Sequence, residues 1–277
     1  MQITNMMINP LKQKHLDKIP QLNAGVITLN LEDAIAKERK QEALLNIINF
    51  LEQQNNTNSK VVIRVNSLQE GGKAEIEALN KYNFLAIRVP KVSSLNEIKE
   101  ALELIRDDKE LHISLESKEA FYNIRDWKID SRFTTANLGI LDLLNSLNLP
   151  QNLLQLSNPT IDYILSKFLI DCQSVGLEAV SFMYQDYNNL EEFKAWCKKE
   201  KSMGFISKAC LGPKQVEIAN KIFGISKDEI DRAKEIKEFF ENSSQNGENG
   251  IMHPKYGFID EPIYKDALLV LRTSQCI

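Results

Sequence analysis

Short apolar segments alternate with helix-forming segments along most of this 277-residue chain. Such alternation is typical of a parallel sheet whose successive strands are joined by helices. The expected strands occupy residues 6–9, 26–31, 61–65, 84–89, 111–116, 133–138, 180–183 and 205–211. The expected helices occupy residues 11–22, 44–51, 73–82, 95–106, 161–172, 190–200, 213–223, 228–240 and 263–272.

About eight strand–helix repeats predict an α/β fold, a single (β/α)₈ TIM barrel with a C-terminal helical extension. We expect the barrel domain at residues 1–241 and the extension at residues 242–277, because residues 242–250 are polar and rich in Asn and Gly. The alternative is an open, doubly wound sheet. No G-x-G-x-x-G follows the early strands, so the dinucleotide site of that fold would lack its phosphate-binding turn.

Composition narrows the class of protein further. A hydrophobic content of 43% is enough for one large core. The net charge is -4, and the lysines alternate with glutamates along helices, so we expect no nucleic-acid partner. No signal peptide and no apolar run long enough to span a membrane are recognisable. The cysteines show no paired spacing, which favours a reducing cytoplasm; they are Cys172, Cys197, Cys210 and Cys276.

Charged side chains recur where the expected strands end. In a TIM barrel these ends form one rim, and active sites lie on it. Carboxylates on this rim would offer the oxygen ligands that Mg²⁺ prefers, and an arginine beside them would bind an anion. The residues are Glu32, Asp33, Arg64, Glu116 and Asp142.

Each of these residues also has a simpler interpretation. The acids could cap helices or be solvated, and Asp33 in particular precedes a helix-forming segment. Arg64 lies in an apolar run, where burying it costs several kcal/mol unless it is paired, so a structural ion pair is the alternative. Lys91 follows Pro90 and could meet an anion at the rim or remain solvated. His112 lies in the middle of a strand and is expected in the core.

The order of motifs along the chain resembles the HpcH/HpaI aldolase and citrate lyase β-subunit family. The marker D-L-E-D-A-V of that family is similar to residues 30–35, and its V-R-V-N is similar to residues 63–66. Its L-P-K, its strand ending in Glu, and its G-x-x-D-L are similar to residues 89–91, 113–116 and 139–143. Further similar segments are residues 37–40, 204–215 and 257–262.

The sequence also departs from the family pattern at several positions. Asn30 stands where the marker begins with Asp, and Gly212 stands where the family has His before Pro213. Ser207 replaces the Gly before Lys208. The segment at 7–11 lacks the usual L-F-V-P-G-N-R. These differences affect the residues around the substrate and leave the metal ligands in place.

The resemblance implies a Mg²⁺-dependent carbon–carbon lyase in a TIM barrel. Its substrate would be a 3-hydroxyacyl thioester of the citryl-CoA or malyl-CoA type, cleaved to an acetyl thioester and an oxo acid. Glu116 and Asp142 would bind the metal, and Glu32 and Asp33 would order water around it. Arg64 would stabilise the enolate and bind substrate. Lys91 would also contact the substrate.

The same resemblance implies that Asp260, lent by a neighbouring subunit, exchanges a proton with the acetyl carbon. We therefore expect a homo-oligomer, a trimer, or a subunit of a lyase complex. The acyl carrier would be CoA or an acyl-carrier protein. Alternatives are that Asp260 caps the last helix, that the barrel is a non-catalytic subunit or scaffold, or that it is an aldolase acting on free 2-oxo acids.

Overall fold

The computed structural model describes residues 4–53, 57–244 and 249–275, and it divides into two compact units. The larger unit is Gln2–Phe223, and the smaller unit is Gly224–Ile277. The sequence placed the division after residue 241, which lies inside a helix of the smaller unit. The structural division comes earlier than expected because this helix packs against the C-terminal segment.

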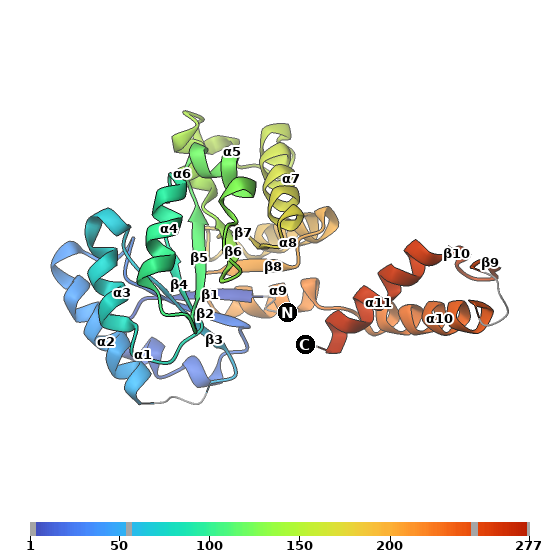
Figure 1. Ribbon diagram of the computed structural model, residues 1–277, viewed down its shortest axis with the longest axis horizontal. Helices are drawn as coiled ribbons and strands as arrows, with labels where there is room; N and C mark the ends of the chain where they lie inside the picture. Colours follow the sequence, from blue (N-terminus) through green and yellow to red (C-terminus); the bar gives the residue numbers. More distant parts are fainter. Residues whose placement is uncertain (1–3, 54–56, 245–248, 276–277) are drawn as a thin grey trace. The chain divides into compact units, whose positions relative to one another are not determined.

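The larger unit is a closed barrel of parallel strands in which each strand pairs with the next in sequence order (Figure 1). β8 pairs with β1 through Thr4↔Lys208 and Met6↔Cys210, which closes the barrel. The predicted (β/α)₈ fold is confirmed. The strands are β1 (Thr4–Ile8), β2 (Val26–Asn30), β3 (Lys60–Arg64), β4 (Ala86–Val89), β5 (Glu110–Leu115), β6 (Phe133–Leu138), β7 (Glu178–Ser181) and β8 (Ser207–Cys210).

Helices follow the strands and lie outside the barrel (Figure 1). The α-helices of this unit are α1 (Gln13–Leu16), α2 (Lys40–Glu52), α3 (Lys73–Leu79), α4 (Leu95–Leu104), α5 (Lys118–Trp127), α6 (Ile140–Ser146), α7 (Pro159–Ser174), α8 (Leu190–Met203) and α9 (Pro213–Phe223). Shorter helical segments are η1 (Ile19–Gln21), η2 (Lys37–Arg39), η3 (Leu68–Gly72) and η4 (Gln151–Leu153). Because the helices cover the outer face, the strand ends are left for a site.

Burial on both faces explains the almost continuous apolar runs of the strands. All five residues of β2 are buried, and Ile27 and Leu29 have no exposed surface. Burying one large aliphatic side chain contributes roughly 1.5–3 kcal/mol, so each strand adds several such terms to the core. His112 is 2% exposed, which confirms its expected place in the core.

The helix expected at 11–22 is replaced by two short segments, α1 and η1. Pro20 explains the difference, because it lacks the backbone N–H that would bond to the carbonyl of Leu16 and continue the α-helix. The helix expected from residue 95 begins there as α4, and Ser94 caps it. Its Oγ accepts a hydrogen bond from the Glu97 backbone N–H at 3.3 Å, and the Glu97 carboxylate accepts one from the Ser93 N–H at 2.8 Å.

The smaller unit combines two helices with a β-hairpin that the sequence did not indicate. Its elements are α10 (Lys227–Ser244), β9 (Gly250–His253), β10 (Gly257–Asp260) and α11 (Glu261–Gln275). Ile236, Phe240 and Ile259 are buried together, and Phe240 stacks on Tyr264 with ring centroids 4.6 Å apart. Because α10 continues to Ser244, part of the expected loop at 242–250 is helical, and residues 245–248 lie outside the described residues.

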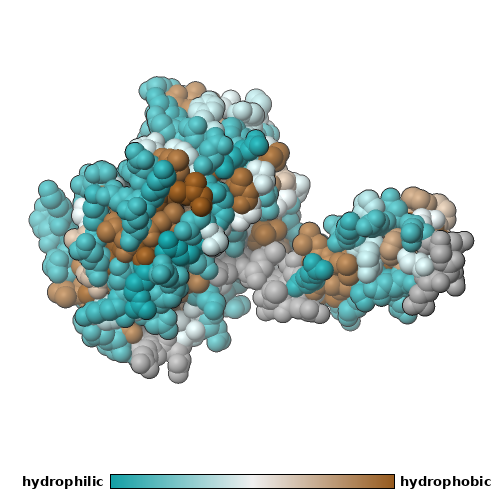
Figure 2. All heavy atoms as spheres, viewed as in Figure 1, coloured by the Kyte–Doolittle hydropathy of each residue, from teal (hydrophilic) through white to brown (hydrophobic). Residues whose placement is uncertain are grey.

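Apolar side chains also reach the surface of the smaller unit, where Met252, Phe258 and Leu269 are 69%, 57% and 63% exposed. Figure 2 shows such side chains among a largely hydrophilic exterior. Within the described ranges, no helix has the length and apolar character needed to cross a membrane. Three of the cysteines are free and buried, and Cys276 lies outside the described residues.

Candidate active site at the rim of the barrel

A cavity of about 390 Å³ lies at the carboxyl ends of the barrel strands. Four of the charged residues that the sequence singled out line it: Asp33, Arg64, Glu116 and Asp142. Arg64 ends β3, and the three acids follow β2, β5 and β6, so the closed barrel brings together residues far apart in sequence. Arg88 and Asn137 line the same cavity.

Arg64, the last residue of β3, forms a buried ion-pair cluster with two carboxylates. Its Nη2 lies 2.6 Å from Glu32 Oε2 and 3.1 Å from Glu116 Oε1, and the three side chains are 8%, 4% and 5% exposed. Asp33 Oδ2 is farther away, at 3.8 Å. Two carboxylates, Glu32 and Glu116, thus supply the ion-pair partner that a buried arginine needs. The Nε–H of Arg64 is buried without a hydrogen-bond partner among the described residues.

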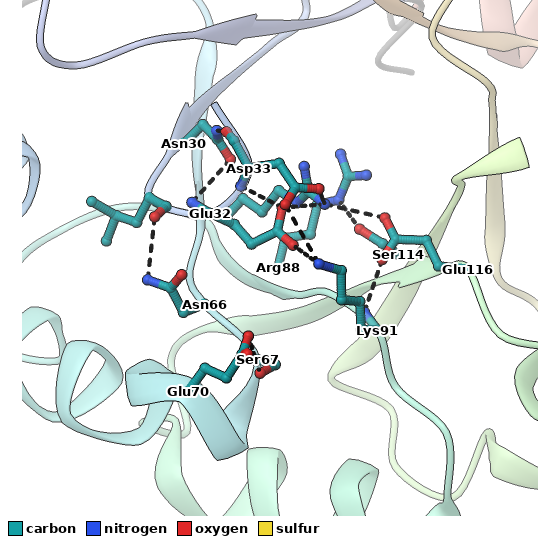
Figure 3. A network of polar contacts seen from close by, with 12 residues as sticks. Asn30, Glu32, Asp33, Asn66, Ser67, Glu70, Arg88, Lys91, Ser114 and Glu116 are labelled. Carbon is teal, nitrogen blue, oxygen red and sulfur yellow. Dashed lines mark hydrogen bonds and ion pairs between the residues drawn. The ribbon is translucent and has the colours of Figure 1, made fainter. Parts of the chain in front are cut away.

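Lys91 connects the same carboxylates from the next strand end. Its Nζ lies 2.9 Å from Glu32 Oε1 and 3.4 Å from Asp33 Oδ1, while its backbone N–H donates to Glu116 Oε2 at 2.9 Å. Figure 3 shows these side chains converging. Lys91 has φ 53°, in the left-handed region that costs non-glycine residues about 1–2 kcal/mol. This strained backbone places both donors of Lys91 on the acidic cluster.

The turn after β2 is held by Asn30. Its side-chain amide donates to the backbone carbonyl of Asp33, and its carbonyl oxygen accepts from the Glu32 N–H at 3.3 Å. Ala34 closes the turn with φ 69°. An ionised aspartate cannot donate the first of these hydrogen bonds. Asn30, which departs from the family pattern, therefore supports the loop that carries Glu32 and Asp33.

Carboxylates and cations lie close together in this partly buried site, and the pKa values of several of these groups are shifted. Burial raises the pKa of Glu32, and the Arg64 and Lys91 cations offset this only in part. For Asp33, partial burial acts upward, but the contacts with Glu32, Arg64 and Lys91 outweigh it and lower the pKa. The hydrogen bond to Glu32 raises the pKa of Lys91. Burial and the nearby Arg64 cation lower the pKa of Arg88 to about 9, so Arg88 is charged at neutral pH.

Gly139 and Asp142 form the side of the cavity next to Glu116. A Cβ atom on Gly139 would lie 2.3 Å from Glu116 Cγ and 2.9 Å from its Oε1. Only glycine leaves room for this carboxylate, which gives the glycine of the motif a physical role. Asp142 lies in the first turn of α6, and within the described residues its side chain has no hydrogen bond or ion pair. Partial burial and the nearby Asp33 raise the pKa of Asp142.

These residues fit a hard divalent cation. Each oxygen of Glu116 accepts one hydrogen bond and so retains a lone pair, and the Asp142 carboxylate has none of its lone pairs engaged within the described chain. Partial burial, and after it the nearby negative charge of Asp33, raises the pKa of Asp142, and a bound cation would favour its ionised form. No group of three or more His, Cys, Asp or Glu side chains placed to hold a metal occurs in the described ranges. Two carboxylates suffice for Mg²⁺, which completes its shell with water and substrate.

The sequence did not single out Arg88 or Asn137. Arg88 lies in the apolar run Ala86-Ile87-Arg88-Val89, the same pattern that drew attention to Arg64. Asp260 belongs to the smaller unit, at the end of β10. Its Oδ1 accepts a hydrogen bond from the Ile263 N–H at 3.3 Å, so it caps α11, as one of the two interpretations expected.

The matching family model is that of HpcH/HpaI aldolase/citrate lyase, and it covers residues 5–213. A (3S)-malyl-CoA thioesterase of Cereibacter sphaeroides is 30% identical over 241 residues, which span 86% of this chain and 82% of that protein. The mitochondrial citramalyl-CoA lyase of Homo sapiens is 26% identical over 283 residues, which span 92% of this chain and 80% of that protein.

Solved structures show the same fold. A citrate lyase from Burkholderia xenovorans superimposes with a TM-score of 0.86 at 14% identity, covering 100% of this chain and 92% of the other. The protein CitE from Mycobacterium tuberculosis, crystallised with magnesium, acetoacetate and coenzyme A, has a TM-score of 0.76 at 17% identity, with coverages of 99% and 98%. With a family model matched over most of its length, this chain belongs to the HpcH/HpaI aldolase/citrate lyase family.

Proposed function

We propose that this protein is a Mg²⁺-dependent lyase that cleaves a carbon–carbon bond of a 3-hydroxyacyl-CoA thioester. The observation that carries the proposal is the convergence on one cavity of Glu116, Asp142 and Arg64, whose Nε–H meets no acceptor in the described part of the chain. The lyase names of the similar proteins support it. The products would be an acetyl thioester and an oxo acid.

Glu116 and Asp142 are the residues that would hold the metal. Mg²⁺ bound there would act as a Lewis acid and orient the oxo-acid part of the substrate. Glu116 is held in place by the Arg64 guanidinium and the Lys91 backbone N–H, so its carboxylate is oriented before any ligand binds. Asp142 is the freer of the two, since no described residue bonds to its side chain.

Cleavage sends the electrons of the carbon–carbon bond into the thioester, which becomes an enolate, while the hydroxyl gives up its proton to water and becomes a carbonyl. Arg64 would donate hydrogen bonds to the oxygen on which this negative charge develops. Its Nη2 is fixed by Glu32 and Glu116, which leaves its Nε–H available. A donor fixed in advance costs little reorganisation during the reaction, and losing one such donor typically costs about 10²–10³ in kcat.

Glu32 and Asp33 would act through their neighbours. Glu32 holds both Arg64 and Lys91, and Asp33 contacts Lys91 as well. Lys91, 44% exposed at the side chain, would face the thioester or carboxylate of the substrate. The carboxylates thus set the positions of two cations instead of reacting themselves.

The enolate must then take up a proton at its terminal carbon to become the acetyl thioester. We propose Asp260 of a second copy of the chain for this step, within a homo-oligomer, most simply a trimer. The support is the match of residues 257–262 to the family motif and the apolar surface of the smaller unit, which a second copy would cover.

The direct test is to incubate the protein with citryl-, citramalyl- and malyl-CoA and Mg²⁺, and to measure oxo-acid release. Release from at least one thioester, abolished by a chelator, supports the lyase. No release from the CoA esters or from acyl-carrier-protein thioesters would favour a non-catalytic subunit, whereas activity only on free 2-oxo acids would favour an aldolase.

A thioesterase is the second candidate function. The 30% identity to a (3S)-malyl-CoA thioesterase over most of both chains favours it specifically. Hydrolysis would break the bond between carbonyl carbon and sulfur and leave the carbon skeleton intact. The two reactions therefore differ in whether free CoA or an oxo acid appears.

A further inference from the structure

We propose that Arg88 binds a second carboxylate on the oxo-acid part of the substrate. The preferred substrate would then be a thioester whose cleavage releases a dicarboxylic oxo acid, as a citryl thioester does. This inference deepens the lyase function proposed above and rests on it. It names the group that distinguishes this substrate from citramalyl and malyl thioesters.

Among the described residues, Arg88 has partners for only a small part of its guanidinium. Arg88 lies on β4, is 5% exposed and lines the cavity. Its Nε–H donates to Ser114 Oγ at 2.8 Å. Within the described residues it makes no other hydrogen bond and no ion pair within 4.0 Å. Figure 3 shows Arg88 beside Ser114, close to Glu116. Arg88 as a whole is buried but lines the cavity, so its two terminal nitrogens are donors that a ligand in the cavity can reach.

The other cations of the site are already engaged. Arg64 is shared between Glu32 and Glu116, and Lys91 is paired with Glu32 and Asp33. Glu116 and Glu32 attract Arg88 only from beyond ion-pair distance. A buried charge without a partner is costly, so a protein retains one where a ligand supplies the missing charge.

The surroundings of Arg88 are polar for a barrel interior, which branched apolar side chains usually fill. Thr28 Oγ1 donates to Asn5 Oδ1 at 2.6 Å, and Asn5 Nδ2 donates to Asn137 Oδ1 at 3.3 Å. Ser114, which holds Arg88, is the register partner of Asn137 across β5 and β6. These polar side chains bond to one another or to Arg88. The Arg88 guanidinium is the charged group of this cluster.

The size and lining of the cavity fit a small dicarboxylate. Glu116, Asp142 and Arg88 line one space of about 390 Å³. An oxo acid with one carboxylate bound near Glu116 and Asp142 could therefore turn its other end to Arg88. A methyl group or hydrogen at that end would leave the guanidinium unpaired. Sites built to bond a polar group discriminate strongly against ligands that lack it.

The test compares malate with lactate, which differ by one carboxylate and do not decarboxylate. Both are titrated calorimetrically into the Mg²⁺-loaded protein and into Arg88→Met, Arg88→Lys and the surface control Arg125→Met. We expect the wild type and Arg125→Met to bind malate at least about 10-fold more tightly than lactate. Arg88→Met should lose this preference, and Arg88→Lys should keep part of it, because a lysine retains the charge but not the fork of donors.

The activity arm measures kcat/KM for citryl-CoA and citramalyl-CoA. Arg88→Met should lower the citryl to citramalyl ratio by about 30-fold or more, the effect of unpairing a buried charge. Its ligand-free Tm should be equal to or above that of the wild type, since a buried unpaired charge is removed. A lower Tm with an intact malate preference would show that Arg88 is structural and overturn the inference.

The two proposals fail in different ways. If no thioester is cleaved but the malate preference exists and depends on Arg88, the lyase function fails and Arg88 remains a dicarboxylate-binding residue. The Arg88 inference is overturned if Arg88→Met has the same citryl to citramalyl ratio of kcat/KM as the wild type. It is also overturned if the wild type does not distinguish malate from lactate.

Discussion

The carboxylate of Glu116 lies directly over the α-carbon of Gly139, so close that a methyl group there would approach Glu116 Cγ to 2.3 Å. Gly139 has φ -91°, a conformation that other residues also adopt. Glycine is therefore needed at this position for the space that its missing side chain leaves to Glu116, and not for its backbone conformation. The turn that follows β6 is shaped around the residue that follows β5, and this fixes Glu116 on the rim.

Gly139→Ala should reduce Mg²⁺ affinity because it displaces Glu116. We expect a loss of at least about 10-fold, the lower range for disturbing a group that supports a metal ligand. Overpacking should cost about 1–3 kcal/mol of unfolding free energy. Calorimetry with Mg²⁺ or Mn²⁺ measures the first effect, and Glu116→Gln is the matched variant. If Glu116→Gln binds the metal as tightly as the wild type, Glu116 is not a ligand.

Asp142→Asn should separate stability from metal binding. The pKa of Asp142 is raised in the folded protein, so its ionised form opposes folding above that pKa, and the amide removes this cost. In a chelator, the Tm of the variant should equal or exceed that of the wild type. Added Mg²⁺ should raise the Tm of the wild type but not of the variant. An equal rise in both proteins would exclude Asp142 as a ligand.

The fully buried ion pair between Lys208 and Glu200 should matter for stability and not for chemistry. Lys208 Nζ lies 2.7 Å from Glu200 Oε1 and 3.9 Å from the centroid of the Phe182 ring, and both charged side chains have no exposed surface. Lys208→Met alone should cost about 3–5 kcal/mol, because it leaves Glu200 buried and unpaired. The double variant with Glu200→Leu should recover most of this loss in chemical denaturation. Equal loss in single and double variants would contradict the pairing argument.

Shared sites predict complementation between inactive subunits. Asp260→Ala and Arg64→Ala should each abolish activity, and co-refolding them should restore part of it, because some interfaces then combine an intact Arg64 with an intact Asp260. Each variant mixed with wild type serves as the control for assembly. If mixing restores nothing although both variants assemble with wild type, Asp260 does not act across subunits.

The barrel was predictable because buried parallel strands appear in a sequence as apolar runs that alternate with amphipathic helices. Arg64 was recognisable for the same reason, since a charge inside such a run needs a partner. Arg88 lies in an equally apolar run. The sequence does not show that Arg64 is paired with carboxylates whereas the guanidinium of Arg88 faces a cavity. That difference depends on which strand ends the barrel brings together.

Other features depend on contacts that no local pattern carries. The room that Gly139 leaves for Glu116 joins the ends of two strands, and the amide of Asn30 fits a turn whose geometry the sequence does not display. The hairpin of β9 and β10 was missed because its strands are short and half exposed. The division at Phe223 follows from the packing of α10 on α11, which composition does not mark.

The most direct test of the lyase function identifies the products. Citryl-, citramalyl- and malyl-CoA are incubated with the Mg²⁺-loaded protein, and oxo acid, acetyl-CoA and free CoA thiol are quantified together. The account predicts equal amounts of oxo acid and acetyl-CoA, no free thiol, and a loss of about 10²-fold or more in kcat for Arg64→Met. Release of free thiol without oxo acid, or cleavage that survives a chelator, would contradict it.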